Sequence, residues 1–195
     1  MRFSVGSGYE IKVIDPKTGK IVDIAKKKND LMVNNMIQIA YGIFKGGSIT
    51  LTDTSNQSKT FEKVLFTESG GLAPSGNTDY GVIIGKDSSV SVNDYAIYTP
   101  LTGSEWSYGA CTKYTNTCSS SGWCNQFGVE RKITYLGSTP ATVSCIGLIS
   151  KIGGKDTSGN DISSYFLLLK DLTNLTVNPG YILDAKVYIT LNPLG

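Results

Sequence analysis

The sequence predicts a mainly β protein, folded as an antiparallel β-sandwich with one N-terminal amphipathic helix. Only 17% of the residues are charged, and polarity comes instead from Ser and Thr, with 22 Gly and 11 Tyr beside them. That composition favours strands and tight turns. Apolar and polar side chains also alternate along much of the chain, which is the period of a half-buried strand. No repeat or linker divides the 195 residues, so residues 1–195 are expected to form a single domain.

The N-terminal part of the chain predicts a hairpin followed by a helix. YEIKVI (9–14) and IVDIA (21–25) alternate on either side of the turn DPKTGK. In NDLMVNNMIQIAYGIFKGG the apolar residues return every three or four positions, which predicts an amphipathic helix over roughly 31–45. Asp30 can cap the start of this helix, and Gly46-Gly47 can end it.

After the helix the apolar period changes to two, which predicts a series of strands. SITLTD, FEKVLF and the short GVIIG come first, and NQFGVERKITYLG and ATVSCIGLIS follow with the turn GSTP between them. SYFLLLK and YILDAKVYITL complete the series. The last strand has one packed and one wet side, as in a two-layer antiparallel sandwich. The packed side is expected to hold Leu183, Ala185, Val187, Ile189 and Leu191, and the wet side Asp184, Lys186, Tyr188 and Thr190. We therefore expect roughly eight to ten strands.

Several classes of function are disfavoured by what the sequence lacks. It has no histidine, which removes the commonest general base and any Ser-His or Cys-His pair. It also lacks a glycine-rich phosphate loop and a G-x-S-x-G motif. A glycoside hydrolase would need two carboxylates facing each other, and no spacing suggests such a pair. We therefore expect a protein that is not an enzyme and has no metal or other cofactor.

The charge pattern and the N-terminus bear on partners and location. The net charge is +2 and the basic residues are spread out, except for the run Lys26-Lys27-Lys28. Such a run is usually a solvated flank, so no specific nucleic-acid binding is expected. No stretch approaches the roughly 18 apolar residues of a transmembrane segment. The N-terminus has no signal-peptide pattern, so we expect synthesis in a cytoplasm without export by the common secretory route.

Residues 81–101, GVIIGKDSSVSVNDYAIYTPL, resemble a recurring pattern in virion structural proteins of phages and archaeal viruses. In that pattern a short strand ending in glycine precedes a Ser/Thr/Pro-rich loop, an Asp-Tyr pair and a short apolar stop. The pair here is Asp94-Tyr95. The later order of RKITYLGSTPATVSCIGL, FLLLKDL, VNPGYIL and a final long strand is also similar. Physically, Asp94 can accept backbone N–H bonds and hold a turn, and Tyr95 can bury its ring.

This resemblance implies a jelly-roll-like β-sandwich in the capsid, turret or tail of a virus, and it implies no catalytic residues. Such a protein is found in the virion after synthesis in the host cytoplasm. It acts by assembly with copies of itself and other virion proteins, and a symmetric ring of copies is expected. Two features depart from the pattern: Cys145 stands where an acidic residue often precedes I-G-L, and residues 99–124 have no counterpart.

Residues 99–124 are expected to form an irregular surface insertion rich in cysteine and aromatic residues. The cysteines of the chain are Cys111, Cys118, Cys124 and Cys145, and the six, five and twenty residues between them do not match zinc-binding C-x2-C pairs. A catalytic thiol would lack a base. Disulfides are favoured, and three connectivities are possible. We prefer Cys111–Cys118 with Cys124–Cys145. If GSTP is a turn, the strands that contain Cys124 and Cys145 would lie side by side. The alternative for Cys145 is a free buried thiol.

Disulfides in a chain without an export signal suit intracellular proteins of hyperthermophiles, or a particle that oxidises after release. Both suit a virus of a hyperthermophilic archaeon.

The aromatic residues of the insertion suggest an interaction surface. They are Trp106, Tyr108, Tyr114 and Trp123. Their rings could contact a partner subunit, or cover the disulfides as a small core. If they are exposed around a groove, they could instead bind a host-surface sugar. The alternative function is therefore a carbohydrate- or receptor-binding β-sandwich on a virion or cell surface.

Overall fold

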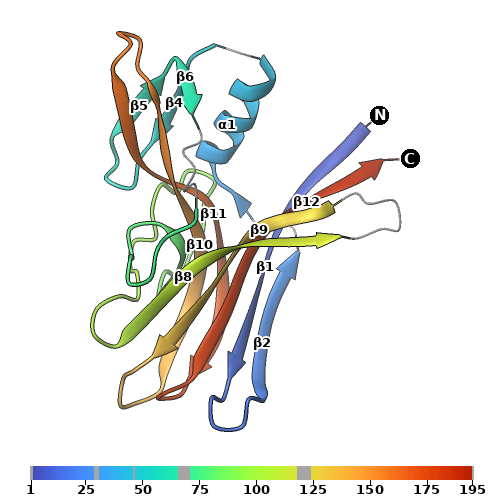
Figure 1. The fold of residues 1–195 in the computed structure, drawn as a ribbon, viewed down its shortest axis with the longest axis vertical. Helices are drawn as coiled ribbons and strands as arrows, with labels where there is room; N and C mark the ends of the chain where they lie inside the picture. Colours follow the sequence, from blue (N-terminus) through green and yellow to red (C-terminus); the bar gives the residue numbers. More distant parts are fainter. Residues whose placement is uncertain (1, 29–30, 46, 66–70, 118–123, 195) are drawn as a thin grey trace.

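The computed structural model describes residues 2–28, 31–45, 47–65, 71–117 and 124–194. Two antiparallel sheets stack against each other, and a helix and a small hairpin lie at one end of the stack (Figure 1). The predicted mainly β, antiparallel sandwich with one helix is confirmed for these residues. Its core combines inward-facing side chains of both sheets with side chains of the helix, the small hairpin and the loops.

The first sheet has five strands, and the two ends of the chain lie side by side in it. Its strands, in spatial order, are β2 (Ile21–Lys28), β1 (Arg2–Ile14), β12 (Ile182–Leu194), β9 (Cys124–Tyr135) and β8 (Trp106–Thr117). β1 pairs with β12 from Arg2 opposite Leu194 to Ile14 opposite Ile182 (Figure 1). Leu183, Ala185 and Val187 are buried, so the predicted alternation of the last strand is confirmed for these three residues.

The second sheet is dominated by one long hairpin. Its strands are β3 (Leu31–Met32), β11 (Asp161–Val177), β10 (Ala141–Lys155), β6 (Lys63–Leu65) and β7 (Gly81–Gly85), of which β6 and β7 both pair with β10. β10 and β11 run together for most of their 15 and 17 residues. Both strands are buried over their middle thirds, so this hairpin supplies one wall of the core.

The helix α1 (Asn34–Lys45) packs beside the hairpin of β4 (Ile49–Thr52) and β5 (Ser58–Phe61). The buried Asn35 side chain fixes this arrangement: Nδ2 donates to the Thr52 and Leu167 carbonyls at 2.7 and 3.2 Å, and Oδ1 accepts the Thr52 N–H. The helix begins three residues later than the predicted residue 31, because Leu31 and Met32 pair with β11 instead. The predicted cap, Asp30, lies outside the described residues.

Two of the sequence-based predictions of local structure are wrong. The segment GSTP does not join neighbouring strands: β9 pairs with β8 and β12, whereas β10 lies in the other sheet, so residues 136–140 cross between the sheets. Residues 106–117 are not an irregular excursion but form β8. Their Ser-, Thr- and Asn-rich composition resembles a loop, yet Trp106, Tyr108 and Cys111 face the core, with an irregularity between the last two that shifts the alternation.

Several strands that follow each other in sequence are hairpin partners within one sheet. This is so for β1 and β2, for β8 and β9, and for β10 and β11. The jelly-roll winding expected within the sandwich class is not confirmed by this strand order.

A buried arginine ties the irregular segment 71–80 to the first sheet. Arg131 on β9 is 1% exposed, and no carboxylate pairs with it among the described residues. Its guanidinium donates instead to backbone carbonyls, those of Pro74, Asn77, Tyr80, Val82 and Gly109. The Tyr108 ring lies beneath it, 4.6 Å from Cζ to the ring centre. Burial lowers the pKa of Arg131, but an arginine remains charged at neutral pH.

We expect Arg131→Met to lower the free energy of unfolding by about 3–5 kcal/mol, because the carbonyls that the guanidinium satisfies would remain buried without donors. Urea denaturation measured by circular dichroism checks this. Lys132→Met on the same strand is the control, since Lys132 is exposed and its loss should change stability by no more than about 0.5 kcal/mol. Equal effects of the two substitutions would contradict the role given to Arg131.

Candidate binding face of the five-stranded sheet

The outer face of the five-stranded sheet, meaning its side chains that point away from the core, holds rows of cross-strand neighbours. In one row Lys26, Glu10, Lys186 and Glu130 lie opposite one another on β2, β1, β12 and β9. Their charges alternate, which stabilises the pairing of the strands. Lys186 Nζ lies 3.4 Å from Glu130, and Glu10 also pairs with Lys12 on its own strand at 3.0 Å.

The neighbouring row is aromatic and contains two glycines. It runs Lys28, Gly8, Tyr188, Gly128 and Tyr114 across the same five strands. The ring centres of Tyr114 and Tyr188 are 6.1 Å apart and the rings are tilted by 47°. Because both partners of Tyr188 in this row lack side chains, the two tyrosine rings can approach each other across β9.

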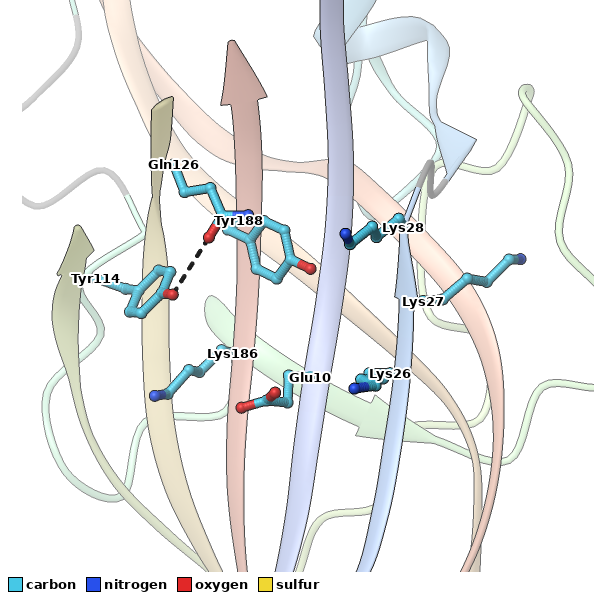
Figure 2. Close-up of a pocket in the computed structure, with 8 residues that line it drawn as sticks. All are labelled: Glu10, Lys26, Lys27, Lys28, Tyr114, Gln126, Lys186 and Tyr188. Atoms are coloured by element: carbon cyan, nitrogen blue, oxygen red, sulfur yellow. Dashed lines mark hydrogen bonds between the residues drawn. The ribbon is translucent and has the colours of Figure 1, made fainter. Parts of the chain in front are cut away.

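The two rows together line a pocket of about 460 Å³, which we call the tyrosine–lysine pocket. It is lined by Glu10, Lys26, Lys27, Lys28, Tyr114, Gln126, Lys186 and Tyr188. Figure 2 shows that Tyr114, Tyr188, Lys186 and Glu10 lie together over β12 and its neighbours, while the Lys27 side chain points away from the others. Lys27 instead forms an ion pair with the buried Asp171 of β11 at 2.7 Å.

The edge strand β2 presents apolar side chains to solvent. Ile21, Val22 and Ile24 are 49%, 51% and 48% exposed, although each is large and apolar. The opposite edge of the same sheet is covered, because the Cys111 N–H donates to the Ala73 carbonyl at 2.8 Å and the Gly76 N–H donates to that of Tyr108 at 2.7 Å. The two edges of this sheet therefore differ in how far the rest of the chain protects them.

The predicted interaction aromatics do not form one surface. Trp106 and Tyr108 are buried, so of the alternatives left open for them an exposed interaction surface is wrong. Trp106 packs on Tyr135 with 4.5 Å between ring centres, and the Tyr108 hydroxyl donates to the Leu101 carbonyl at 2.7 Å. Tyr114 is partly exposed and belongs to the tyrosine–lysine pocket. Trp123 lies outside the described residues.

The cysteines are arranged differently from the preferred pairing. Cys111 and Cys145 are free buried thiols, so neither Cys111–Cys118 nor Cys124–Cys145 is formed. Cys124 and Cys145 are not opposite each other on paired strands as predicted, because β9 and β10 belong to different sheets. Cys118 lies outside the described residues, and only the backbone of Cys124 is described. The alternative of a free buried thiol at Cys145 therefore holds, and burial raises the pKa of this thiol to about 11.

The Asp94-Tyr95 motif lies in the loop that follows β7. The Asp94 carboxylate accepts the Ser91 N–H at 3.1 Å, and the Tyr95 ring packs edge-on against Tyr98. Asp94 also binds the ammonium of Lys170, a β11 residue whose side chain is fully buried, at 2.8 Å. Asp87 binds the same ammonium at 2.7 Å and accepts the N–H groups of Tyr98 and Thr99.

Burial and direct contacts act in opposite directions on the pKa values of Asp87 and Lys170. Burial alone would raise the pKa of Asp87, but Lys170 and the two backbone N–H groups outweigh it, so the pKa lies below its ordinary value. Burial likewise would lower the pKa of Lys170, and its two carboxylate partners raise it instead. Asp87 and Lys170 are therefore charged at neutral pH, and the contacts of Lys170 with Asp87 and Asp94 fix the loop 86–101 to the second sheet.

Comparison with models of protein families, with curated proteins and with solved structures found no match. Within the described ranges, no three His, Cys, Asp or Glu side chains are grouped so that they could hold a metal ion. No helix in those ranges has the length and apolar character that a bilayer crossing needs.

Sequence reasoning missed most of this face. It placed Lys186 and Tyr188 on the wet side of the last strand, but it did not connect them with Lys26 or Tyr114. The register that joins these residues depends on β12 lying between β1 and β9, and no local pattern specifies that order. The glycines Gly8 and Gly128 could have pointed to this face. An isolated glycine inside a strand often marks a place where another group approaches the backbone closely.

We expect Cys145 to react with iodoacetamide at pH 8 at least about a hundredfold more slowly in the folded protein than in urea, because the thiol is buried and its raised pKa leaves little thiolate. Peptide mass spectrometry would locate the label, and Cys145→Ser serves as the control for assignment. An intact mass without reductant that shows Cys145 in a disulfide would contradict the free thiol.

We also expect the Asp87–Lys170 pair to contribute to acid sensitivity. Since the folded pKa of Asp87 is lowered, its contribution to stability is present above the ordinary carboxyl pKa of about 4 and is lost as the pH falls through the lower folded value. Asp87→Asn should therefore cost about 3 kcal/mol or more at pH 7 and should weaken the fall in stability between pH 5 and pH 2. Urea denaturation at several pH values measures both effects.

The matched control is Asp161→Asn, which removes an exposed carboxylate paired with Lys155. It should change the unfolding free energy by less than about 1 kcal/mol. An Asp87→Asn protein with wild-type stability at pH 7 would show that the buried pair does not hold the loop.

Proposed function

We propose that this protein is a non-enzymatic structural subunit of a virus particle and that it acts by assembly with copies of itself. The order of motifs from residue 81 to the final strand supports the virion class through its resemblance to virion structural proteins. The observation that supports assembly is the apolar, exposed edge of β2.

An uncovered strand edge with large apolar side chains is a liability for a protein that remains monomeric. Proteins usually protect such edges with charges, bulges or covering loops. On this sheet the chain covers the β8 edge with the segment 73–76. The other edge has lysines only in the last part of β2, and Ile21, Val22 and Ile24 in its first part are about half exposed. Burial of these side chains against a second copy would remove apolar surface from water on both subunits.

The contact is expected to be made by side chains rather than by extension of the sheet. The N–H of Ile24 is already satisfied by the Asp23 carboxylate at 2.8 Å, so one backbone donor of this edge has a partner within its own chain. A contact of one β2 strand with the β2 strand of a second copy uses the same patch twice and closes with two-fold symmetry. Such pairs are units from which a larger ring or shell could be built.

The expectation of a hyperthermophilic archaeal host depended on disulfides. Cys111 and Cys145 are free thiols, whereas the side chains of Cys118 and Cys124 lie outside the described residues, so the host stays a prediction.

We expect the wild-type chain to form dimers or larger assemblies, and Val22→Lys/Ile24→Lys to raise the dissociation constant at least about a hundredfold by placing charges in the apolar contact. Size-exclusion chromatography with light scattering, over a micromolar concentration series, measures this. Leu136→Lys is the control, because Leu136 is an exposed apolar residue away from β2. A monomeric wild type, or assembly unaffected by the double substitution, would overturn the role of β2.

The virion assignment needs a separate observation. Peptides of this chain should be recovered from nuclease-treated, density-banded particles of the culture that expresses it, in amounts comparable to other particle proteins. Recovery only from the soluble cell fraction would contradict the assignment even if the chain assembles.

A further inference from the structure

The tyrosine–lysine pocket contains a stacking surface that the proposed assembly does not use. Tyr188 lies between Gly8 and Gly128 in its cross-strand row. A Cβ atom at position 8 would lie 2.8 Å from two carbons of the Tyr188 ring, so the ring lies directly over Gly8. At position 128 a Cβ atom would collide with the backbone of Val187 and Tyr188. Glycine on both sides therefore lets the Tyr188 ring lie low against the sheet.

The second tyrosine forms a wall beside this surface. The Tyr114 hydroxyl donates to Gln126 Oε1 at 3.4 Å, and Lys186 Nζ lies 5.0 Å from the centre of the Tyr114 ring. These contacts hold Tyr114 from two sides, and its ring is tilted by 47° against that of Tyr188 (Figure 2). The pocket thus offers one flat aromatic face bounded by an angled one.

Positive charge adjoins the flat face. Lys26 and Lys28 are exposed, and neither forms an ion pair with another of the described residues. Figure 2 shows their side chains on β2, beside Glu10 and Tyr188. The other charges of the pocket are balanced locally, since Glu10 pairs with Lys12 and Lys186 with Glu130. Two ammonium groups without carboxylate partners next to an aromatic face favour a ligand that combines a ring with a negative charge.

The acceptors in the pocket indicate which class of anionic ligand fits. Glu10 and Gln126 offer oxygen atoms that can accept hydrogen bonds from hydroxyl groups. A single-stranded nucleic acid also stacks on aromatic residues, but it needs a positively charged groove that follows its backbone, and the unpaired positive charge here is confined to Lys26 and Lys28. The net charge of the whole chain is only +2, which gives little long-range attraction for a polyanion. A sugar with hydroxyl groups and one anionic substituent per ring meets all of these groups.

We propose that the tyrosine–lysine pocket binds an acidic oligosaccharide, with one sugar ring stacked on Tyr188, its carboxylate or sulfate on Lys26 and Lys28, and its hydroxyl groups on Glu10 and Gln126. The site goes beyond the proposed assembly and does not depend on it. It also differs from the sugar site expected from the sequence, because Trp106 and Tyr108 are buried and, of the predicted aromatics that the structure describes, only Tyr114 is shared.

The test is isothermal titration of the full-length protein with four probes. Tetragalacturonate supplies carboxylates, its full methyl ester keeps the rings without the charge, a heparin tetrasaccharide supplies sulfates, and oligo(dT) represents single-stranded nucleic acid. We expect at least one of the two acidic oligosaccharides to bind, and their relative affinity to identify the anion. The methyl ester should bind at least about tenfold more weakly than tetragalacturonate if carboxylates are recognised, and added salt should weaken the binding of either acidic probe.

Variants separate stacking from charge. Tyr188→Ala should weaken binding at least about tenfold, while Tyr188→Phe keeps the ring and should stay within about threefold of wild type. Lys26→Gln/Lys28→Gln should also weaken binding at least about tenfold, since it removes both unpaired charges. These lysines are exposed, so this variant remains informative if Tyr188→Ala fails to fold. Lys132→Met, on the outer face but outside the pocket, is the control and should bind as wild type does.

Three results would overturn the proposal: no binding of either acidic oligosaccharide, tighter binding of oligo(dT) than of both, or wild-type affinity in the Lys26→Gln/Lys28→Gln protein. The light-scattering measurement of assembly is independent of each of them, so failure of this site and failure of the proposed assembly can be told apart.

Discussion

Two buried cations hold two irregular stretches of this chain, one on each side of β7, against the sandwich. Arg131 gathers carbonyls of the segment 74–82 and of β8, and Lys170 gathers the carboxylates of Asp87 and Asp94 with the Ala96 carbonyl. Irregular backbone is normally excluded from a protein interior because its polar groups lack partners. Each cation supplies several such partners at one point, so two stretches of loop can pack against the sandwich without regular structure of their own. The cost of burying each charge is offset only while all of these contacts persist together.

This arrangement decides which surfaces remain for function. The segment fixed by Arg131 covers the edge of β8, and the loop fixed by Lys170 runs alongside β7, where Gly85 bridges Pro100. The ion pair of Lys27 with Asp171 then closes one flank between the two sheets. What stays accessible on the five-stranded sheet is its outer face and the apolar part of β2. The loops thus act as internal covers, and the candidate contact and binding surfaces lie on regular strands whose positions are fixed by pairing.

The sequence predicts the class of fold because alternation reports directly on burial. The burial of Arg131 also has a signal in the sequence. Val129, Arg131 and Ile133 are alternate residues of one strand, so they face the same side of the sheet, and both neighbours of Arg131 on that side are apolar. What it could not supply is long-range order. GSTP resembles a hairpin turn locally, yet β12 enters the sheet between β1 and β9 and displaces β10 to the other layer. The pocket, the cysteine environments and the burial of Trp106 all follow from that order, and so they were missed or misassigned.

The two proposed surfaces meet on one strand. Ile24, Lys26 and Lys28 occupy successive outer-face positions of β2, opposite Lys12, Glu10 and Gly8. A two-fold contact centred on the apolar segment 21–24 would therefore place the Lys26 and Lys28 groups of both copies near the same interface, one pair on each side of the axis. Two sugar sites at a fixed spacing bind a repeating acidic glycan with higher avidity than either site alone, without any new contact. If β2 forms the contact between copies through residues 21–24, that contact also fixes the distance between the Lys26 and Lys28 groups of the two copies. This is a geometric reason for one edge strand to contain both the apolar segment and the lysines.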